Sequence, residues 1–162
     1  QTSILDIGCG TFPFFFSFFN FTNKHALDRI LVPTPQDMHF TNQDLQVNVQ
    51  LPFEDNTFDV ITALAFVEHI NYANRKKLFL EVYRVLNKGG MFFLTTPSKC
   101  TEAILVVLAK LNMVSPEELR EHQDLLTPGE LKELLMLSGF DRSTIQSGRF
   151  EAGLNLYATA VK

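Results

Sequence analysis

The sequence is poor in cysteine, in positive charge and in long apolar runs. Its two cysteines, Cys9 and Cys100, form neither a disulfide framework nor a CxxC metal motif, which fits a reducing cytoplasm. The formal net charge is −4, so the chain offers no general attraction for nucleic acid, whose binding relies on Lys and Arg contacts to phosphate. No apolar run reaches the roughly 18–20 residues that a membrane span needs.

The remaining composition is that of an ordinary globular protein. Hydrophobic residues make up 46% of the chain and charged residues 20%, which excludes a disordered or fibrous chain. A length of 162 residues fits one domain with one sizeable core. We therefore expect a single domain over residues 1–162.

The opening stretch, residues 4–11 (ILDIGCGT), predicts a short buried strand, a tight turn and the start of a helix. Gly8 and Gly10 let the backbone turn with no Cβ in the way of a ligand. The ligand can then lie against main-chain N–H groups at the positive end of the helix. A lone Gly-x-Gly pair can be only a turn, but Asp6 before it and Thr11 after it favour a binding turn.

Strand and helix patterns alternate along the rest of the chain. Apolar residues at helical spacing predict an amphipathic helix over residues 75–86. This alternation predicts a doubly wound, mostly parallel α/β sheet. A short connection between the last two predicted strands suits a hairpin, and hence an antiparallel strand. Strands are predicted at residues 4–7, 24–28, 38–43, 58–64, 91–96, 144–150 and 154–161.

Two further helices are predicted to be apolar. Residues 12–21 contain seven phenylalanines, and a helix apolar on every side should be buried. Packing in the core is the first interpretation, and the alternative is a dimer interface or a surface that another segment covers. Residues 102–111 predict an apolar helix too short to span a bilayer. Core packing is again the first interpretation, with a lid over an acceptor or a contact with a lipid-like acceptor as the alternative.

The motifs resemble a known family. Asp6-Ile7-Gly8-Cys9-Gly10-Thr11 is similar to the first motif of the class I S-adenosylmethionine-dependent methyltransferases. Residues 51–60 (LPFEDNTFDV) and Val67-Glu68-His69-Ile70 resemble the methyltransferase type 11 branch. The resemblance covers nearly the whole chain and implies a seven-stranded Rossmann-like sheet with an antiparallel C-terminal strand. Family members usually carry an N-terminal helical segment over the cofactor, so this chain looks like a core without that lid.

The resemblance implies a site for S-adenosylmethionine. Asp28 lies eighteen residues after Gly10, close to the spacing of about 20 at which such folds place a carboxylate for ribose hydroxyls. Asp44 and its neighbour Leu45 match the family's adenine contacts. Ala63 and Leu64 end the fourth strand, and together with Ala65 they are expected to line the floor beneath the methionine moiety. The expected cofactor-binding residues are Asp6, Gly8, Cys9, Gly10, Asp28, Asp44, Leu45, Ala63 and Leu64.

Two histidines are the candidates for catalysis. If the acceptor is a hydroxyl, a base with a pKa near neutrality would help, and we name His69 and His122. The alternatives are a structural hydrogen-bonding role for His69 and a plain surface position for His122. Some ubiquinone-pathway O-methyltransferases complete a metal site with an acid three residues before the Glu-His pair. Ala65 stands there in this chain, so we expect no metal.

One departure from the family keeps alternatives open. Phe12 stands where the family usually has glycine, and its ring could crowd the methionine part of the cofactor or point into the core. We expect a cytoplasmic methyltransferase acting on a small-molecule or lipid- or sugar-linked acceptor. The alternative is a non-catalytic binding module with the same fold. An NAD-binding oxidoreductase is a further alternative, but it predicts Gly-x-Gly-x-x-Gly, and Pro13 stands where the last glycine would be.

Overall fold

The protein is represented by a computed structural model, which describes residues 2–11, 16, 20–30, 37–99, 101 and 125–162. Most of the helix predicted over residues 12–21 lies outside these ranges. The helix predicted over residues 102–111, together with Phe12 and His122, lies outside them altogether.

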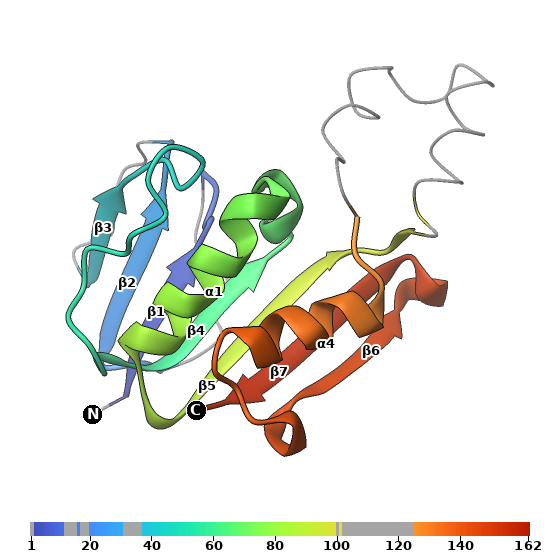
Figure 1. Cartoon of the computed structure of the whole chain (residues 1–162). Helices are drawn as coiled ribbons and strands as arrows, with labels where there is room; N and C mark the ends of the chain where they lie inside the picture. Colours follow the sequence, from blue (N-terminus) through green and yellow to red (C-terminus); the bar gives the residue numbers. More distant parts are fainter. Residues whose placement is uncertain (1, 12–15, 17–19, 31–36, 100, 102–124) are drawn as a thin grey trace.

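A seven-stranded sheet runs through the described part of the chain (Figure 1). The strands follow one another in the order β3-β2-β1-β4-β5-β7-β6 across the sheet. Strands β1 to β5 are parallel to one another, whereas β7 is antiparallel to both β5 and β6. This topology confirms the predicted doubly wound, Rossmann-like sheet with its antiparallel C-terminal strand. The strands are β1 (Ser3–Ile7), β2 (Asn23–Asp28), β3 (Met38–Asn42), β4 (Phe58–Leu64), β5 (Leu86–Pro97), β6 (Gln146–Phe150) and β7 (Asn155–Val161).

Helices α1 (Tyr72–Val85) and α4 (Pro128–Leu137) cover the same face of the sheet (Figure 1). Helix α1 begins three residues before the predicted start because the Asn71 side chain caps it, accepting a hydrogen bond from the backbone N–H of Asn74. Helix α4 begins with a capping box between Thr127 and Glu130. Among the helices of the described residues, none is long and apolar enough to cross a membrane.

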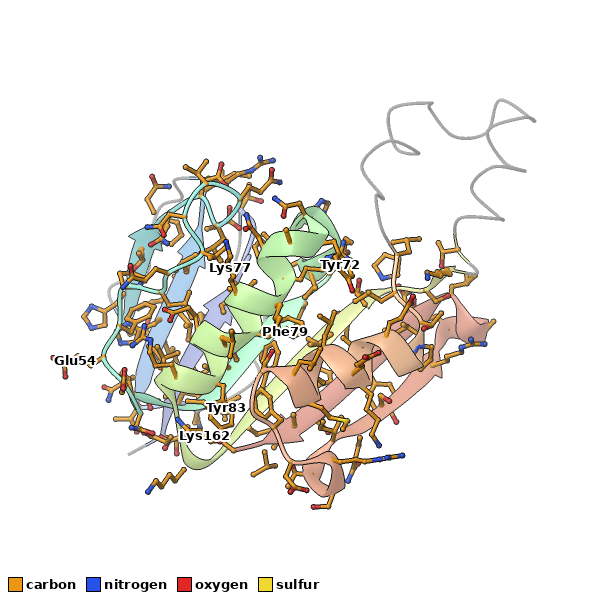
Figure 2. All side chains as sticks on the ribbon, viewed as in Figure 1. Glu54, Tyr72, Lys77, Phe79, Tyr83 and Lys162 are labelled. Carbon is orange, nitrogen blue, oxygen red and sulfur yellow. The ribbon has the colours of Figure 1, made fainter. Side chains whose placement is uncertain are left out.

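The main core lies between the sheet and these two helices. Leu5 and Ile7 of β1 alternate with residues of the opposite face, as the twofold period of a strand requires. The ring of Phe79 on α1 meets that of Phe92 on β5, with centroids 5.5 Å apart (Figure 2). The opposite face carries a smaller apolar cluster that includes Ile4. Packing on the helix-covered face thus fixes the strand ends from which the site is built.

Strand β5 begins earlier than the sequence predicts. Phe58 pairs with Leu86 but Val60 pairs with Met91, so a bulge separates the two halves of the strand. Gly90 makes this geometry feasible, because a Cβ there would lie 2.9 Å from the Asn87 carbonyl oxygen. The prediction of a strand from residue 91 was wrong because apolar patterning does not reveal pairing through a bulge.

Lys162 fastens the end of α1. Its Nζ donates hydrogen bonds to the carbonyl oxygens of Leu86 at 2.8 Å and Arg84 at 3.2 Å, and to Asn56 Oδ1 at 2.9 Å. It also lies 4.8 Å from the centroid of the Tyr83 ring (Figure 2). The ammonium group therefore satisfies carbonyls at the helix terminus, which have no partner within the helix.

Candidate functional site

A cavity of about 240 Å³ opens where the parallel strands β1 to β4 end. Open α/β sheets place their ligands in this position, beyond the carboxyl ends of the strands. Seven residues named from the sequence line it: Gly8, Gly10, Asp28, Asp44, Leu45, Ala65 and His69. Seven further residues complete the lining: Leu27, Arg29, Ile30, Gln43, Gln46, Phe66 and Ile70.

The glycine turn follows β1 and forms one side of the cavity. Gly8 and Gly10 have φ angles of +73° and +65°, a region that side chains other than glycine rarely adopt. The backbone N–H of Gly8 donates to the carbonyl oxygen of Leu27 at 2.8 Å, which ties the turn to β2. Among the described residues, a Cβ on Gly10 would meet no atom within 4 Å.

Asp28, the last residue of β2, anchors that turn. Its Oδ2 accepts a hydrogen bond from the Gly10 N–H at 2.8 Å, and its Oδ1 accepts one from the Ile30 N–H at 2.9 Å. The residue is 8% exposed yet lines the cavity. A carboxylate oxygen can accept more than one hydrogen bond, so both oxygens keep capacity for donors on a ligand.

The loop after β3 forms the second wall. Asp44 Oδ1 accepts a hydrogen bond from the Gln46 N–H at 2.8 Å, which closes a tight Asx turn. The Gln46 side chain then donates to the carbonyl oxygen of His69 at 2.8 Å. Leu45 is 2% exposed and supplies apolar surface to the cavity. Gln46 thereby joins the loop after β3 to the segment after β4 that carries His69.

The turn after β4 forms the third wall. Ala65 has a φ of +49°, and its N–H donates to both the carbonyl oxygen and the Oγ1 of Thr95, at 3.0 and 3.1 Å. Phe66 follows and lines the cavity. The short 3-10 helix η2 (Val67–His69) comes next and carries an exposed His69 side chain to the cavity edge.

The two halves of the Glu-His pair face different surroundings. Glu68 is buried, and its Oε2 accepts a hydrogen bond from Thr96 Oγ1 at 3.1 Å. Buried Arg75 donates from Nε to the carbonyl oxygens of Val67 at 3.0 Å and Ile70 at 2.7 Å, and so holds the η2 turn. Only His69 of the pair is thus placed to meet a ligand.

Four other residues named from the sequence do not line this cavity. Ala63 is buried in the core on the α1 side, and Leu64 is partly buried at the end of β4. Asp6 accepts a hydrogen bond from Thr62 Oγ1 at 2.7 Å, and burial raises the pKa of its carboxyl to about 6. Cys9 lies within the turn, where burial and the nearby carboxylates of Asp6 and Asp28 raise the pKa of its thiol to about 12.

Several lining residues escaped the sequence reasoning. Gln43 and Gln46 flank the Asp44-Leu45 pair, so the sequence indicated this segment of the site but did not identify the two glutamines as lining residues. Phe66 was missed because nothing in its local pattern tells which way its ring points. The described residues hold no group of three or more His, Cys, Asp and Glu side chains that could bind a metal ion.

Comparison with known proteins places this geometry in a family. The Methyltransf_11 family model, a methyltransferase domain, matches residues 5–94. The ubiquinone/menaquinone biosynthesis C-methyltransferase UbiE of Hydrogenovibrio crunogenus is 30% identical over 112 residues, which cover 57% of this chain and 42% of that protein. The chain spans less than half the length of the curated relatives it matches.

Solved structures share the fold. A chain from the complex of the Haloferax volcanii Trm112 methyltransferase activator with a methyltransferase superposes with a TM-score of 0.76 at 13% identity, covering 99% of this chain and 82% of that one. An S-adenosylmethionine-dependent methyltransferase of Mesorhizobium loti gives 0.71 at 17% identity, covering 99% and 90%. The match over residues 5–94 includes the glycine turn, Asp28 and the turn after β4. The chain therefore belongs to the methyltransferase type 11 family, a branch of the class I S-adenosylmethionine-dependent methyltransferases.

Proposed function

We propose that this protein binds S-adenosylmethionine in the cavity at the ends of β1 to β4 and directs its methyl group to a small-molecule acceptor. The proposed acceptors include molecules linked to a lipid or a sugar. The observation that carries it is the Asp28 carboxylate, which holds the glycine turn by its bond to Gly10 and borders the cavity beside Gly10 and Asp44.

The cavity residues fit the chemical parts of this cofactor. The Asp28 oxygens would accept hydrogen bonds from the two ribose hydroxyls. Leu45 and Ile30 supply apolar surface for the base, with the Asp44 segment at its edge. Gly10 leaves room for the ligand, since no atom of the described residues lies within 4 Å of the site that a Cβ would take. A volume of about 240 Å³ in an open cleft suits a ligand that is only partly enclosed.

The protein has little covalent chemistry to supply. Bound S-adenosylmethionine provides an electrophilic methyl group, so the chain's residues must orient the partners and exclude water. Asp28 and the glycine turn would fix the adenosyl end. His69 lies at the cavity edge, where its ring could take the proton of a hydroxyl acceptor. His122 remains a prediction, since it lies outside the described residues.

Binding of S-adenosylhomocysteine by isothermal calorimetry tests the cofactor assignment. We expect micromolar affinity, and a loss of about tenfold or more in Asp28→Asn, since a buried charged hydrogen-bond partner contributes about 1.5–3 kcal/mol. Asp37→Asn is the matched control, because that carboxylate is exposed and only pairs with Lys24. Thermal unfolding of each variant shows that the fold persists.

Two outcomes would contradict the proposal. Binding of NADH without S-adenosylhomocysteine would favour an oxidoreductase, and binding of neither would favour a non-catalytic module. If binding holds, incubation with S-adenosylmethionine and a panel of hydroxyl, amine and lipid-linked acceptors identifies the reaction through release of S-adenosylhomocysteine. His69→Gln should then lower kcat for a hydroxyl acceptor while cofactor affinity stays within a factor of about two.

A further inference from the structure

The ring of Phe66 lies directly on the first glycine of the turn. A Cβ built on Gly8 would stand 2.1 Å from Phe66 Cδ2 and 2.4 Å from Cγ, far inside contact distance. A glycine in such a turn usually lets a ligand approach the backbone closely, but here the Phe66 ring occupies that space beside Gly8. At Gly10, two residues later, no atom of the described part of the chain lies within 4 Å of the equivalent point. Among these residues, a side chain thus covers the turn at Gly8 and none covers it at Gly10.

The covering ring is held firmly. Ala65, the residue before it, has a left-handed φ of +49° and a N–H bonded twice to Thr95. The residues after it are fixed by the Arg75 guanidinium, which reaches the carbonyl oxygens of Val67 and Ile70. A phenylalanine with both flanks anchored behaves as a wall, because moving its backbone would break the Ala65 bonds to Thr95 and the two buried Arg75 bonds.

The strand order shows which part of a ligand this wall faces. The lining residues after β3, β2, β1 and β4 follow one another along the edge of the sheet in that order. An adenosyl ligand with its base near Asp44 and its ribose on Asp28 must direct its sulfur past the glycine turn, toward the end of β4. Phe66 and His69 line that end of the cavity.

We propose that Phe66 is a specificity-determining residue that limits the size of the alkyl group carried on the sulfur of the adenosyl ligand. This inference rests on the proposed function, since it needs an adenosyl sulfonium in the cavity. A methyl group is the smallest alkyl group that the sulfur can carry, and a larger group would collide with a side chain whose backbone is anchored on both sides. Shortening the side chain at position 66 should open that space.

Calorimetry with S-adenosylmethionine and its S-allyl analogue, in which allyl replaces the methyl group, tests the inference. Wild type should bind the allyl analogue about tenfold or more weakly than S-adenosylmethionine, as expected for added carbons in a filled pocket. Phe66→Ala should reduce that ratio at least about fivefold, and Phe66→Leu should give an intermediate ratio. Affinity for S-adenosylhomocysteine, which has no such group, should change much less than the ratio.

The control variant is Phe150→Ala. Phe150 is 38% exposed on the edge strand β6 and does not line the cavity, so this variant should keep the wild-type ratio. An unchanged ratio in Phe66→Leu or Phe66→Ala, with binding of S-adenosylhomocysteine intact, would overturn this inference and leave the proposed function standing. If wild type binds neither S-adenosylmethionine nor S-adenosylhomocysteine, both proposals fall. Should Phe66→Ala not fold, Phe66→Leu decides.

Discussion

At the scale of single residues, the site is built from side chains that serve the fold and the ligand together. Asp28 holds the Gly10 and Ile30 N–H groups with the same two oxygens that face the cavity. Gly8 is needed twice, for its left-handed conformation and for the Phe66 ring that lies on it. Substitutions here will therefore change binding and stability at once, which is why the proposed experiments pair affinity with thermal unfolding.

Asp6 gives a prediction that concerns pH. Burial raises the pKa of its carboxyl to about 6 from an ordinary value of 3.8, with Thr62 opposing and Asp28 adding to the shift. The folded state then binds more protons than the unfolded state between these values, so this residue's contribution to stability falls as pH rises through that window. Two pKa units correspond to a free energy of unfolding on the order of 3 kcal/mol.

Asp6→Asn removes this titration. We expect the variant to gain stability relative to wild type as pH rises from about 4 to about 7. Urea unfolding of both proteins at several pH values measures the difference, in which the titration of all other groups largely cancels. A difference that stays constant with pH would show that Asp6 ionises normally in the folded chain.

At the scale of elements, the ends of helices and strands position the walls of the cavity. Asn71 starts α1 directly after the η2 turn, and Asn74 in the first turn donates from Nδ2 to the Gln46 carbonyl oxygen at 3.2 Å. The helix start therefore also fixes the loop after β3. Helix α4 has its own capping box, and hydrogen bonds from Lys99 and Thr127 lower the pKa of Glu130 to about 2.

The capping box of α4 can be tested by Thr127→Ala. The change removes the hydroxyl that accepts the Glu130 N–H, and loss of such a cap costs about 0.5–2 kcal/mol of stability. Urea denaturation measures this loss, and Thr127→Ser is the matched control because serine keeps the accepting hydroxyl. Equal destabilisation by alanine and serine would mean that the methyl group, rather than the cap, matters here.

At the scale of the whole molecule, the two ends of α1 differ in function: one positions the cavity wall and the other stabilises the fold. Its first turn lies beside the cavity, whereas its last turn is fastened by Lys162, more than 70 positions away along the chain. These hydrogen bonds between residues distant in the sequence hold helix α1 against the sheet at the end remote from the cavity. Stability and ligand binding should therefore separate in variants of Lys162.

Lys162→Met should test this separation. Methionine keeps much of the apolar stem but removes the donor to the Leu86 carbonyl oxygen and one of two donors to that of Arg84, which keeps the Asn56 N–H. We expect a cost of about 1–3 kcal/mol in unfolding free energy. Affinity for S-adenosylhomocysteine should stay within a factor of about two, since no cavity residue contacts Lys162 through a hydrogen bond in the described chain. Equal loss of affinity and stability would show that the two ends are coupled.

The sequence alone determined the order of the strands along the chain, the glycine turn and the antiparallel last strand. These features follow from local patterns: alternation of apolar residues, glycines at positive φ, and a short connection between the last two strands. The sequence also placed Asp28 and Asp44 at or after strand ends and named His69 as a catalytic candidate, and all three line one cavity.

Only the tertiary structure decided the bulge in β5, the separate directions of Glu68 and His69, and the ring of Phe66 over Gly8. Each depends on partners far away in sequence, such as Thr95 for Ala65 or Thr96 for Glu68. In the turn after β4, the directions of the side chains are set by hydrogen bonds to the neighbouring strand β5. The contacts that fix these directions join residues that are distant in the sequence, so they form only when the strands pack into the sheet.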